Sequence, residues 1–371
     1  MRRRNRYGRA IGLCVCLLSV TTSTASQQPS AGQGEFVHSE VTLDARTLSV
    51  RFAPTLRAEN PAHRAVLTPV GGATDGRMLV ARLESDATLR IDTIEIVADQ
   101  SEARRDLWLR VTSDGWQLEV TDPEERGAGV AETVRLSHAT SAAVAPTFSA
   151  ALIATGDSTC RLVMRWGEHE WTTELQGTDR PRDQTERRSP VPGSDAGRDF
   201  DANAVTRAQR FSTRNETALV LPDGQRLSVL FPRALTVGGR DFPHIGAATN
   251  GSIIQWTAGA VTRLKTDVPL RFGGVTLDTG NLAADFAGAY GLWLKRTERG
   301  WRLVFNNEPD AWGTQYDPAF DTAEIDLHHS QGGAVSRPFA VALVPTGADR
   351  GRLAMHWGAH DWFADFVVGG Y

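Results

Sequence analysis

Cysteine is scarce in this chain, which limits how covalent bonds could hold the fold together. Cys14 and Cys16 lie near the N-terminus, and only Cys160 lies in the body of the sequence. If the N-terminal segment that holds Cys14 and Cys16 is cleaved off as a signal peptide, Cys160 has no cysteine to pair with. No intrachain disulfide can then form, even in an oxidising compartment. We expect Cys160 in a turn, either as a bystander thiol or as a nucleophile. Its counterpart in the second half of the chain is Gly351.

Several catalytic signatures are also missing. The sequence has no G-x-S-x-G nucleophile elbow, no G-x-G-x-x-G loop and no G-x-x-x-x-G-K-[ST] loop. Neither a triad on such an elbow nor a glycine-rich phosphate loop is therefore indicated. The net charge is −4, and an acidic chain argues against nucleic acid as a partner. We predict no cofactor, no metal site and no catalytic residue.

The first 26 residues have the pattern of a secretory signal peptide. Arginines precede a short apolar run from Ala10 to Val20, and small residues follow it. The run is too short to span a bilayer as a helix. We expect cleavage near Ala25 or Ser26, a periplasmic or secreted protein, and no membrane span after signal removal.

Short runs of alternating or β-branched residues recur along the rest of the chain. In residues 301–306, WRLVFN, the large apolar Trp301, Leu303 and Phe305 alternate with Arg302, Val304 and Asn306, and this period of two indicates a half-buried strand. Gly300 lies in a polar break between this run and the one before it, which indicates a β-hairpin. Many such runs without a long helical pattern predict an all-β protein.

Similar segments occur in the same order in the two halves of the chain. The pairs are 48–52 with 227–231, 108–116 with 293–301, and 155–171 with 346–362. Their separation is far longer than the period of a solenoid repeat, so they indicate a duplicated domain with loop insertions. We predict two tandem antiparallel β-sandwich domains of jelly-roll-like form.

The predicted boundaries follow composition. They are 1–26 for the signal peptide, 27–35 for a disordered N-terminus, 36–177 for a degenerate first repeat, 178–205 for a disordered linker and 206–371 for the second repeat. The linker has few large apolar residues and cannot bury enough surface to offset its ordering entropy. Each repeat is long enough for a core of its own.

The segment 287–317 carries distinctive motifs, among them Ala287-Gly-Ala-Tyr290 and Trp312-Gly-Thr-Gln-Tyr-Asp317, and the closing strand Leu353–Trp357 follows. With these motifs, most of residues 223–370 resembles the family catalogued as domain of unknown function 2911. The resemblance implies a β-rich domain of the cell envelope with no established activity or cofactor. Thr257 and Val261 stand where the family has arginine and asparagine, so a family site that used those side chains would be altered here.

One cluster in the second repeat combines flat aromatic rings with amides and carboxylates, a mixture that suits sugar rings or peptides. These candidate ligand-binding residues are Asn306, Asn307, Trp312, Gln315, Tyr316, Asp317 and Asp321. The same residues would equally suit a loop folded back on its own sheet. The partner is unknown; a glycan, a peptide or an envelope protein would fit.

The sequence also offers two alternative chemistries. Asp310, Asp317, Asp321 and Asp326, expected in and after the same loop, could perform glycosidic acid/base work or hold Ca²⁺, although loop carboxylates more often cap turns. His356 and His360 could bind a metal, but a zinc site requires three or four ligands, and Arg165 stands in place of His356 in the first repeat. The adjacent His328 and His329 would point apart in a strand.

The function that the sequence favours is a non-enzymatic binding or interaction module of the cell envelope. A hydrolase that acts on envelope polymers with Asp317 and Asp321 is the first alternative. A purely structural scaffold is the second.

Overall fold

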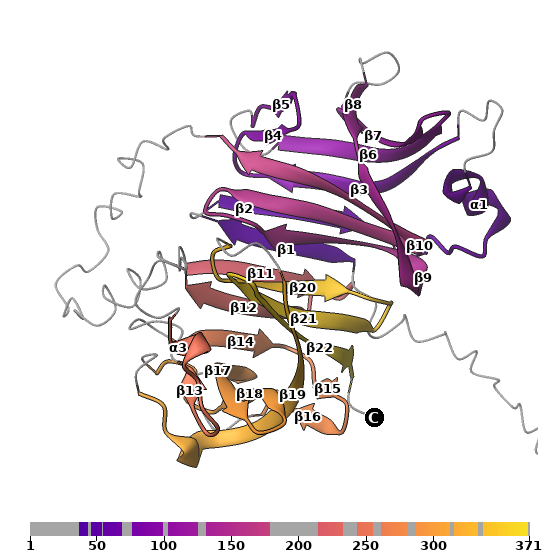
Figure 1. Ribbon diagram of the computed structural model, residues 1–371. Helices are drawn as coiled ribbons and strands as arrows, with labels where there is room; N and C mark the ends of the chain where they lie inside the picture. The colour runs from indigo at the N-terminus through magenta and orange to yellow at the C-terminus, as the bar shows by residue number, and fades with distance from the viewer. Residues whose placement is uncertain are drawn as a thin grey trace, which may run out of the picture. The chain divides into compact units, whose positions relative to one another are not determined.

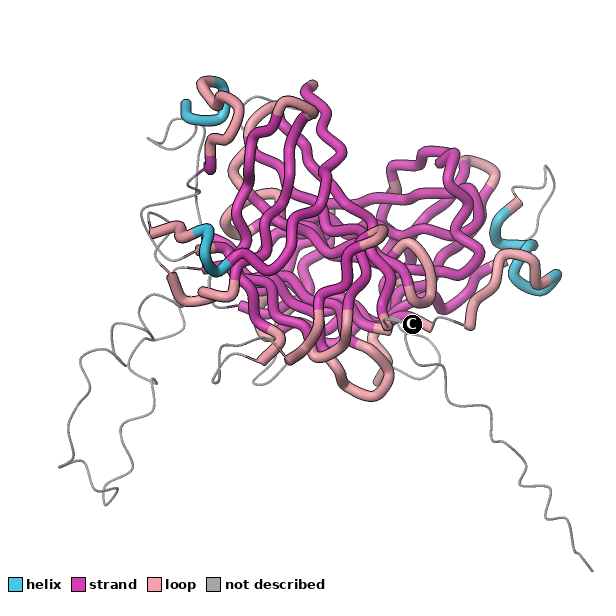
Figure 2. The backbone as a smooth tube through the Cα atoms, turned by 90° about the horizontal axis from the view of Figure 1, so that it is seen from below, coloured by secondary structure: helices cyan, strands magenta, loops and turns pink. Residues whose placement is uncertain are grey.

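The computed structural model is built almost entirely from β-strands. It describes residues 37–43, 46–53, 55–68, 76–98, 103–124, 131–178, 214–232, 243–254, 261–280, 287–311, 315–332 and 337–369. The predicted signal peptide, the disordered N-terminus and nearly all of the predicted linker lie outside these residues. Strands dominate the described backbone, and the short helical segments lie at its margins (Figure 2).

The first half of the chain contains ten strands and one short helix among its described residues. They are β1 (His38–Leu43), β2 (Arg46–Phe52), α1 (Pro61–Leu67), β3 (Arg77–Ser85), β4 (Leu89–Ile91), β5 (Ile94–Ile96), β6 (Ala103–Thr112), β7 (Gly115–Thr121), β8 (Glu132–Arg135), β9 (Ser137–Ala154) and β10 (Thr159–Gly177). Asn60 caps α1 by accepting a hydrogen bond from the backbone N–H of Ala62.

The second half runs through a similar order of elements. They are β11 (Arg214–Val220), β12 (Arg226–Pro232), α3 (Pro243–Gly246), β13 (Ile253–Ile254), β14 (Thr262–Thr266), β15 (Leu270–Phe272), β16 (Val275–Leu277), β17 (Ala289–Thr297), β18 (Gly300–Asn306), η2 (Pro318–Phe320), β19 (Asp321–Gln331), β20 (Ala340–Pro345), β21 (Arg350–Trp357) and β22 (His360–Val368). The hairpin predicted at Gly300 is β17–β18, and Gly300 has the positive φ of 134° that favours glycine.

The two halves join through hydrogen bonds between β1 and β11. These strands lie side by side (Figure 1) and pair antiparallel, and their register places Glu40 opposite Ala218. The pairing continues on one side through β2, β3, β6, β7 and β8, and on the other through β12, β14, β17, β18 and β19. Neither β1 nor β11 is therefore left as an exposed edge. The expectation of an all-β, antiparallel fold is confirmed.

Two layers face each other within the second half. The side of β17 and β18 that carries Leu292 and Phe305 packs towards β20, β21 and β22, and the rings of Trp301 and Trp362 meet edge to face at 5.7 Å. Strand β19 connects the layers, because its first part pairs with β18 and its last part pairs with β22. The sheet therefore curls around its own core.

One hydrophobic core cluster draws residues from both halves of the described chain. It includes Leu109 and Trp166 from the first half and Leu294 and Trp357 from the second. Each buried aromatic removes roughly 150–250 Å² from water, so the buried tryptophans stabilise the fold. None of the described helices is long and apolar enough to cross a membrane.

Candidate functional site

The site predicted from the sequence lies on the outer face of the second-half sheet, the side turned away from the main core. Alternation along β17 sends Leu292 and Leu294 into the main core and Trp293 to the opposite face. There Trp293, Val261 and Val304 form a separate buried cluster, called here the outer-face cluster. Trp293 is 1% exposed, so a second layer of chain must cover it.

The segment that follows β18 covers the outer-face cluster. The ring of Tyr316 lies 5.1 Å from that of Trp293 at 59°, and Ala311 packs against the same cluster. The Tyr316 hydroxyl donates a hydrogen bond to Oδ2 of Asp321. Burial first, and then this bond to a carboxylate, raise the pKa of Tyr316 well above its usual value. The tyrosine is therefore a neutral donor that holds the loop on the sheet.

Asn306 supports this loop from beneath through hydrogen bonds. Its side chain is buried, and its Nδ2 donates to the carbonyl of Asp317 and to Oδ1 of Asp321, each at 2.9 Å. Its Oδ1 accepts from the backbone N–H of Glu308, also at 2.9 Å. A buried amide with its bonds made fixes local geometry, and losing it would leave the partners unsatisfied.

Three of the predicted residues lie at the rim of the loop. Asp317 is exposed and caps η2 by accepting from the backbone N–H of Ala319 at 2.9 Å. Gln315 is exposed, and Phe320 between them and β19 is 43% exposed. Asn307 is half-buried, and its backbone N–H donates to the carbonyl of Phe320 at 2.8 Å. The structure thus brings Asn306, Tyr316, Asp317 and Asp321 together, whereas Trp312 lies outside the described residues.

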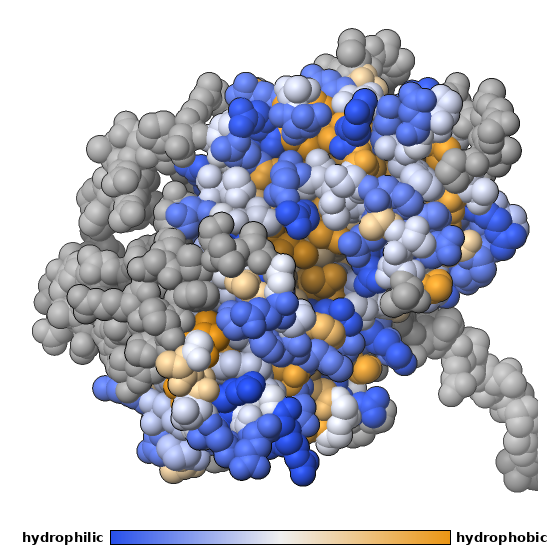
Figure 3. Space-filling view, in the orientation of Figure 1, coloured by the Kyte–Doolittle hydropathy of each residue, from blue (hydrophilic) through white to orange (hydrophobic). Residues whose placement is uncertain are grey.

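Phe320 is a further candidate that is not among the residues predicted from the sequence. Its ring is one of four large hydrophobic side chains that stand exposed among the described residues. The face drawn in Figure 3 is mainly hydrophilic, with hydrophobic residues gathered near its centre and in smaller spots elsewhere. Scattered exposure of this kind is normal, but Phe320 differs because it belongs to the same loop as the exposed Gln315 and Asp317. Its place directly after Asp-Pro-Ala was the available signal.

Two arginines next to the outer-face cluster were also missed. Arg214 on β11 is buried, and its guanidinium donates to the carbonyl of Val261. Burial lowers its pKa to about 10, with a smaller contribution from the like charge of Arg263, while Asp310 opposes the shift. Burial likewise lowers the pKa of Arg263, against Asp310 and Glu216. A network of charged side chains thus borders the loop. From the alternation of side chains along the strands alone, Arg214 and Arg263 would be expected to face solvent.

Of the carboxylates expected in and after the loop, Asp317 and Asp321 lie close together, whereas Asp326 lies apart from them in the structure. Asp321 begins β19, and Asp326 lies within that strand, where it accepts from Nε of Arg302 at 2.8 Å. The expectation that Asp326 lies on a loop is therefore wrong: the register of β19 against β18 places it opposite Arg302. Asp321 has both oxygens engaged by Asn306 and Tyr316. This arrangement suits support of the loop better than proton transfer.

The predicted histidine pair is also rearranged. His356 on β21 lies opposite Asp361 on β22, whereas the His360 ring contacts that of His329 on β19, with ring nitrogens 3.0 Å apart. His328 and His329 lie on opposite faces of the strand, as expected, and His328 stacks on Phe363. No group of three or more candidate metal ligands occurs among the residues that the structure describes.

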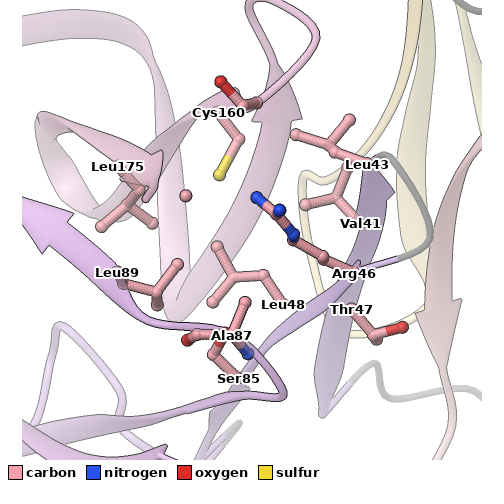
Figure 4. A pocket seen from close by; sticks show the side chains of 12 residues that line it. Val41, Leu43, Arg46, Thr47, Leu48, Ser85, Ala87, Leu89, Cys160 and Leu175 are labelled. Atoms are coloured by element: carbon pink, nitrogen blue, oxygen red, sulfur yellow. The ribbon is translucent and has the colours of Figure 1, made fainter. Parts of the chain in front are cut away.

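Cys160 lies in strand β10 and not in a turn, because the register of β10 against β9 places it opposite Ala154. Its thiol is buried, and burial raises the pKa of the thiol far above its usual value. Cys160 and Leu175 point into a small cavity of about 30 Å³ that Leu48 and Leu89 also line (Figure 4). A thiol held neutral in such a cavity is a poor nucleophile, so the bystander interpretation is favoured.

Comparison with known protein families agrees with the resemblance found in the sequence. Residues 239–365 match the family described as Protein of unknown function (DUF2911). The match includes Trp293, Asn306, Tyr316 and Asp321, so most of the loop support belongs to this DUF2911 region. Val261, within the matched region, packs against Trp293 in the outer-face cluster. No curated protein and no solved structure matches the chain.

Proposed function

We propose that this protein is an exported, non-enzymatic binding module of the bacterial cell envelope. Its ligand site is the exposed rim of the loop in the DUF2911 region, formed by Gln315, Asp317 and Phe320. The observation that supports this most directly is the fixed loop itself. Asn306 and Tyr316 hold the loop on the outer face of the sheet, and the rim side chains project from it.

The rim has the composition of a surface for polar ligands. An exposed ring offers a flat apolar face, and the adjacent amide and carboxylate can fix a ligand's orientation. Glycans and peptides present such alternating apolar and polar features. A rigid support lowers the entropy that binding must overcome, because the side chains are already in place.

The hydrolase alternative receives less support from the geometry. General acid/base catalysis needs a carboxyl group within reach of the substrate's proton. Asp321 is engaged on both oxygens, and one oxygen of Asp317 caps η2. Both carboxylates thus already accept hydrogen bonds that support the loop.

We also propose that the protein consists of two copies of one duplicated unit, delivered by the signal peptide. Support comes from the matching segments and from the matching order of elements, in which β1–β2 and β11–β12 carry LSVRF and LSVLF. N-terminal sequencing of the exported protein should give a first residue near position 26. A protein that retains Met1 would contradict the proposed export.

The binding site is tested by a thermal-shift screen of the whole exported chain against glycans and envelope peptides. A ligand that binds only the folded state adds roughly 2.7 kcal/mol at a hundredfold excess over Kd. Phe320→Ala and Asp317→Asn should abolish the shift, and asparagine at 317 keeps the capping oxygen. Leu79→Ala is the matched control, since Leu79 is 41% exposed in the first half. A shift that survives both rim variants, or no shift from any ligand, would favour a scaffold.

A further inference from the structure

A pair of histidines in the second half rests on two tryptophans. His329 Nε2 and His360 Nδ1 lie 3.0 Å apart across β19 and β22. Their rings lie 5.5 and 5.4 Å from Trp362, and Trp301 lies 5.9 Å from His329. His329 is exposed and His360 half-buried. The two nitrogens are therefore held by packing on one side and approachable from solvent.

The first half holds the same arrangement. His138 Nε2 and His169 Nδ1 lie 3.0 Å apart across β9 and β10. Trp116 lies 4.4 Å from His138 and 4.9 Å from His169, and Trp171 lies 5.4 Å from His169. His138 is exposed and His169 half-buried. Two sites of one geometry thus occur in one chain.

The pairs were kept while their surroundings changed. One offset along the sequence relates 138 to 329, 169 to 360 and 171 to 362. At the same offset, His356 is replaced by Arg165 and His328 by Ser137. A stacked core would tolerate other side chains at these half-exposed positions, so retention of both imidazoles in both halves points to a role that needs their nitrogens.

The spacing of the nitrogens suits two neighbouring ligands of one metal ion. With metal–nitrogen bonds of about 2.0–2.1 Å, nitrogens 3.0 Å apart subtend about 94° at the metal. A tetrahedral centre would separate them by about 3.3 Å. An angle near 90° is that of square-planar or tetragonal Cu²⁺ and Ni²⁺, and imidazole is a favoured ligand for both.

Binding requires only local adjustment. In each pair one ring nitrogen donates its hydrogen to the other, so the donating ring must move that proton to its second nitrogen. Both facing nitrogens then carry lone pairs, and the rings must rotate away from their hydrogen-bonding orientation so that these lone pairs converge on one point. Asp361 is no third ligand, because it accepts two hydrogen bonds from Arg337 at 2.8 and 2.9 Å. The remaining coordination positions stay open to water or to a further ligand.

We infer that each histidine pair, His138 with His169 and His329 with His360, is a two-ligand site for a tetragonal divalent transition metal, with Cu²⁺ the ion of choice. Cu²⁺ binds nitrogen sites most tightly of the divalent first-row ions. The inference is independent of the proposed rim site, which lies on the loop before β19.

Titration of the untagged protein with Cu²⁺, followed by calorimetry and electron paramagnetic resonance, tests the inference. The parent protein should bind two Cu²⁺ per chain, with resonance spectra that show two nitrogen ligands for each ion. His360→Gln and His169→Gln should each remove one site, and the double variant should remove both. His328→Gln is the matched control, because His328 adjoins His329 but faces the other side of β19.

The outcomes separate clearly. A stoichiometry that the variants do not reduce one for one, or spectra without two nitrogens, would overturn the inference. Circular dichroism and urea unfolding establish that each variant is folded. If His360→Gln or His169→Gln fails this check, His329→Gln and His138→Gln replace it, since they remove the other nitrogen of each pair.

Discussion

The two halves fill one position of the core in complementary ways, and exchanging the side chains should reveal this. The sequence offset that relates the histidine pairs also relates Cys160 to Gly351 and Leu175 to Phe366. A Cβ atom built on Gly351 would lie 2.9 Å from two atoms of the Phe366 ring. Glycine is therefore required at 351 because the phenylalanine ring occupies the space that the Cys160 side chain fills in the first half.

The size of the effect follows from these contacts. Leu175→Phe alone should drive the larger ring against Cys160 and cost about 1–3 kcal/mol, the usual cost of overpacking. Cys160→Gly alone loses a buried side chain and places glycine in a strand, at about 0.8 kcal/mol for each buried carbon-sized group and about 0.5–1 kcal/mol for the backbone. The double variant should recover the overpacking cost, because loss of the Cys160 side chain opens space next to the cavity of about 30 Å³ beside Leu175, and the ring can then enter it.

The assay is a double-mutant cycle in which urea unfolding gives the free energy of each variant. The dependence of that free energy on urea concentration must be the same for all four proteins. We expect a favourable coupling free energy of about 1–3 kcal/mol between Cys160→Gly and Leu175→Phe. The reciprocal cycle in the second half uses Gly351→Cys and Phe366→Leu, and it should give coupling of the same sign. Additive effects within about 0.5 kcal/mol in both cycles would refute the argument that the two positions exchange volume.

Three further predictions concern stability. Burial and then the nearby Arg337 lower the pKa of His356 to about 4. The neutral histidine therefore contributes its full stabilisation above the unfolded pKa of about 6.5. As the pH drops towards 4, the free energy of unfolding should fall by up to roughly 3 kcal/mol. Urea midpoints should follow this fall in the parent and much less in His356→Gln; equal slopes would contradict it. Asn306→Ala should lower the free energy of unfolding by about 2–4 kcal/mol, because it leaves Asp321 and two backbone groups without their hydrogen-bond partner. A loss under about 1 kcal/mol in urea unfolding would show that Asn306 is not needed to support the loop. Tyr316→Phe keeps the ring on Trp293 but loses one hydrogen bond, so thermal unfolding should report only about 1–1.5 kcal/mol; a larger loss than for Asn306→Ala would reverse the roles assigned to the two residues.

The candidate loop shows what sequence patterns could and could not supply. The polar and aromatic residues near position 306 were identified as a group, and the structure does bring Asn306, Tyr316 and Asp321 into contact. The sequence left open whether such a group faces a ligand or its own sheet. Only the observed hydrogen bonds separate the buried support from the exposed rim at Gln315, Asp317 and Phe320.

The contacts between histidines, in contrast, could not be predicted from the sequence. The spacing of His356 and His360 suggested a pair, yet His360 meets His329 on a strand distant in the sequence. Partners across a sheet are set by strand register, and register depends on which strands pair. The recurrence of His138 with His329 was present in the sequence, but nothing local showed that either residue had a histidine beside it.

By itself, the sequence determined the all-β class, the hairpin at Gly300 and the DUF2911 resemblance, because alternation, turn residues and short motifs are local properties of the chain. The tertiary structure decided how β1 joins β11, which face of β17 holds Trp293, and which histidines meet. These depend on contacts between residues far apart in sequence, where many pairings satisfy the same local pattern and only packing of the whole sheet selects one.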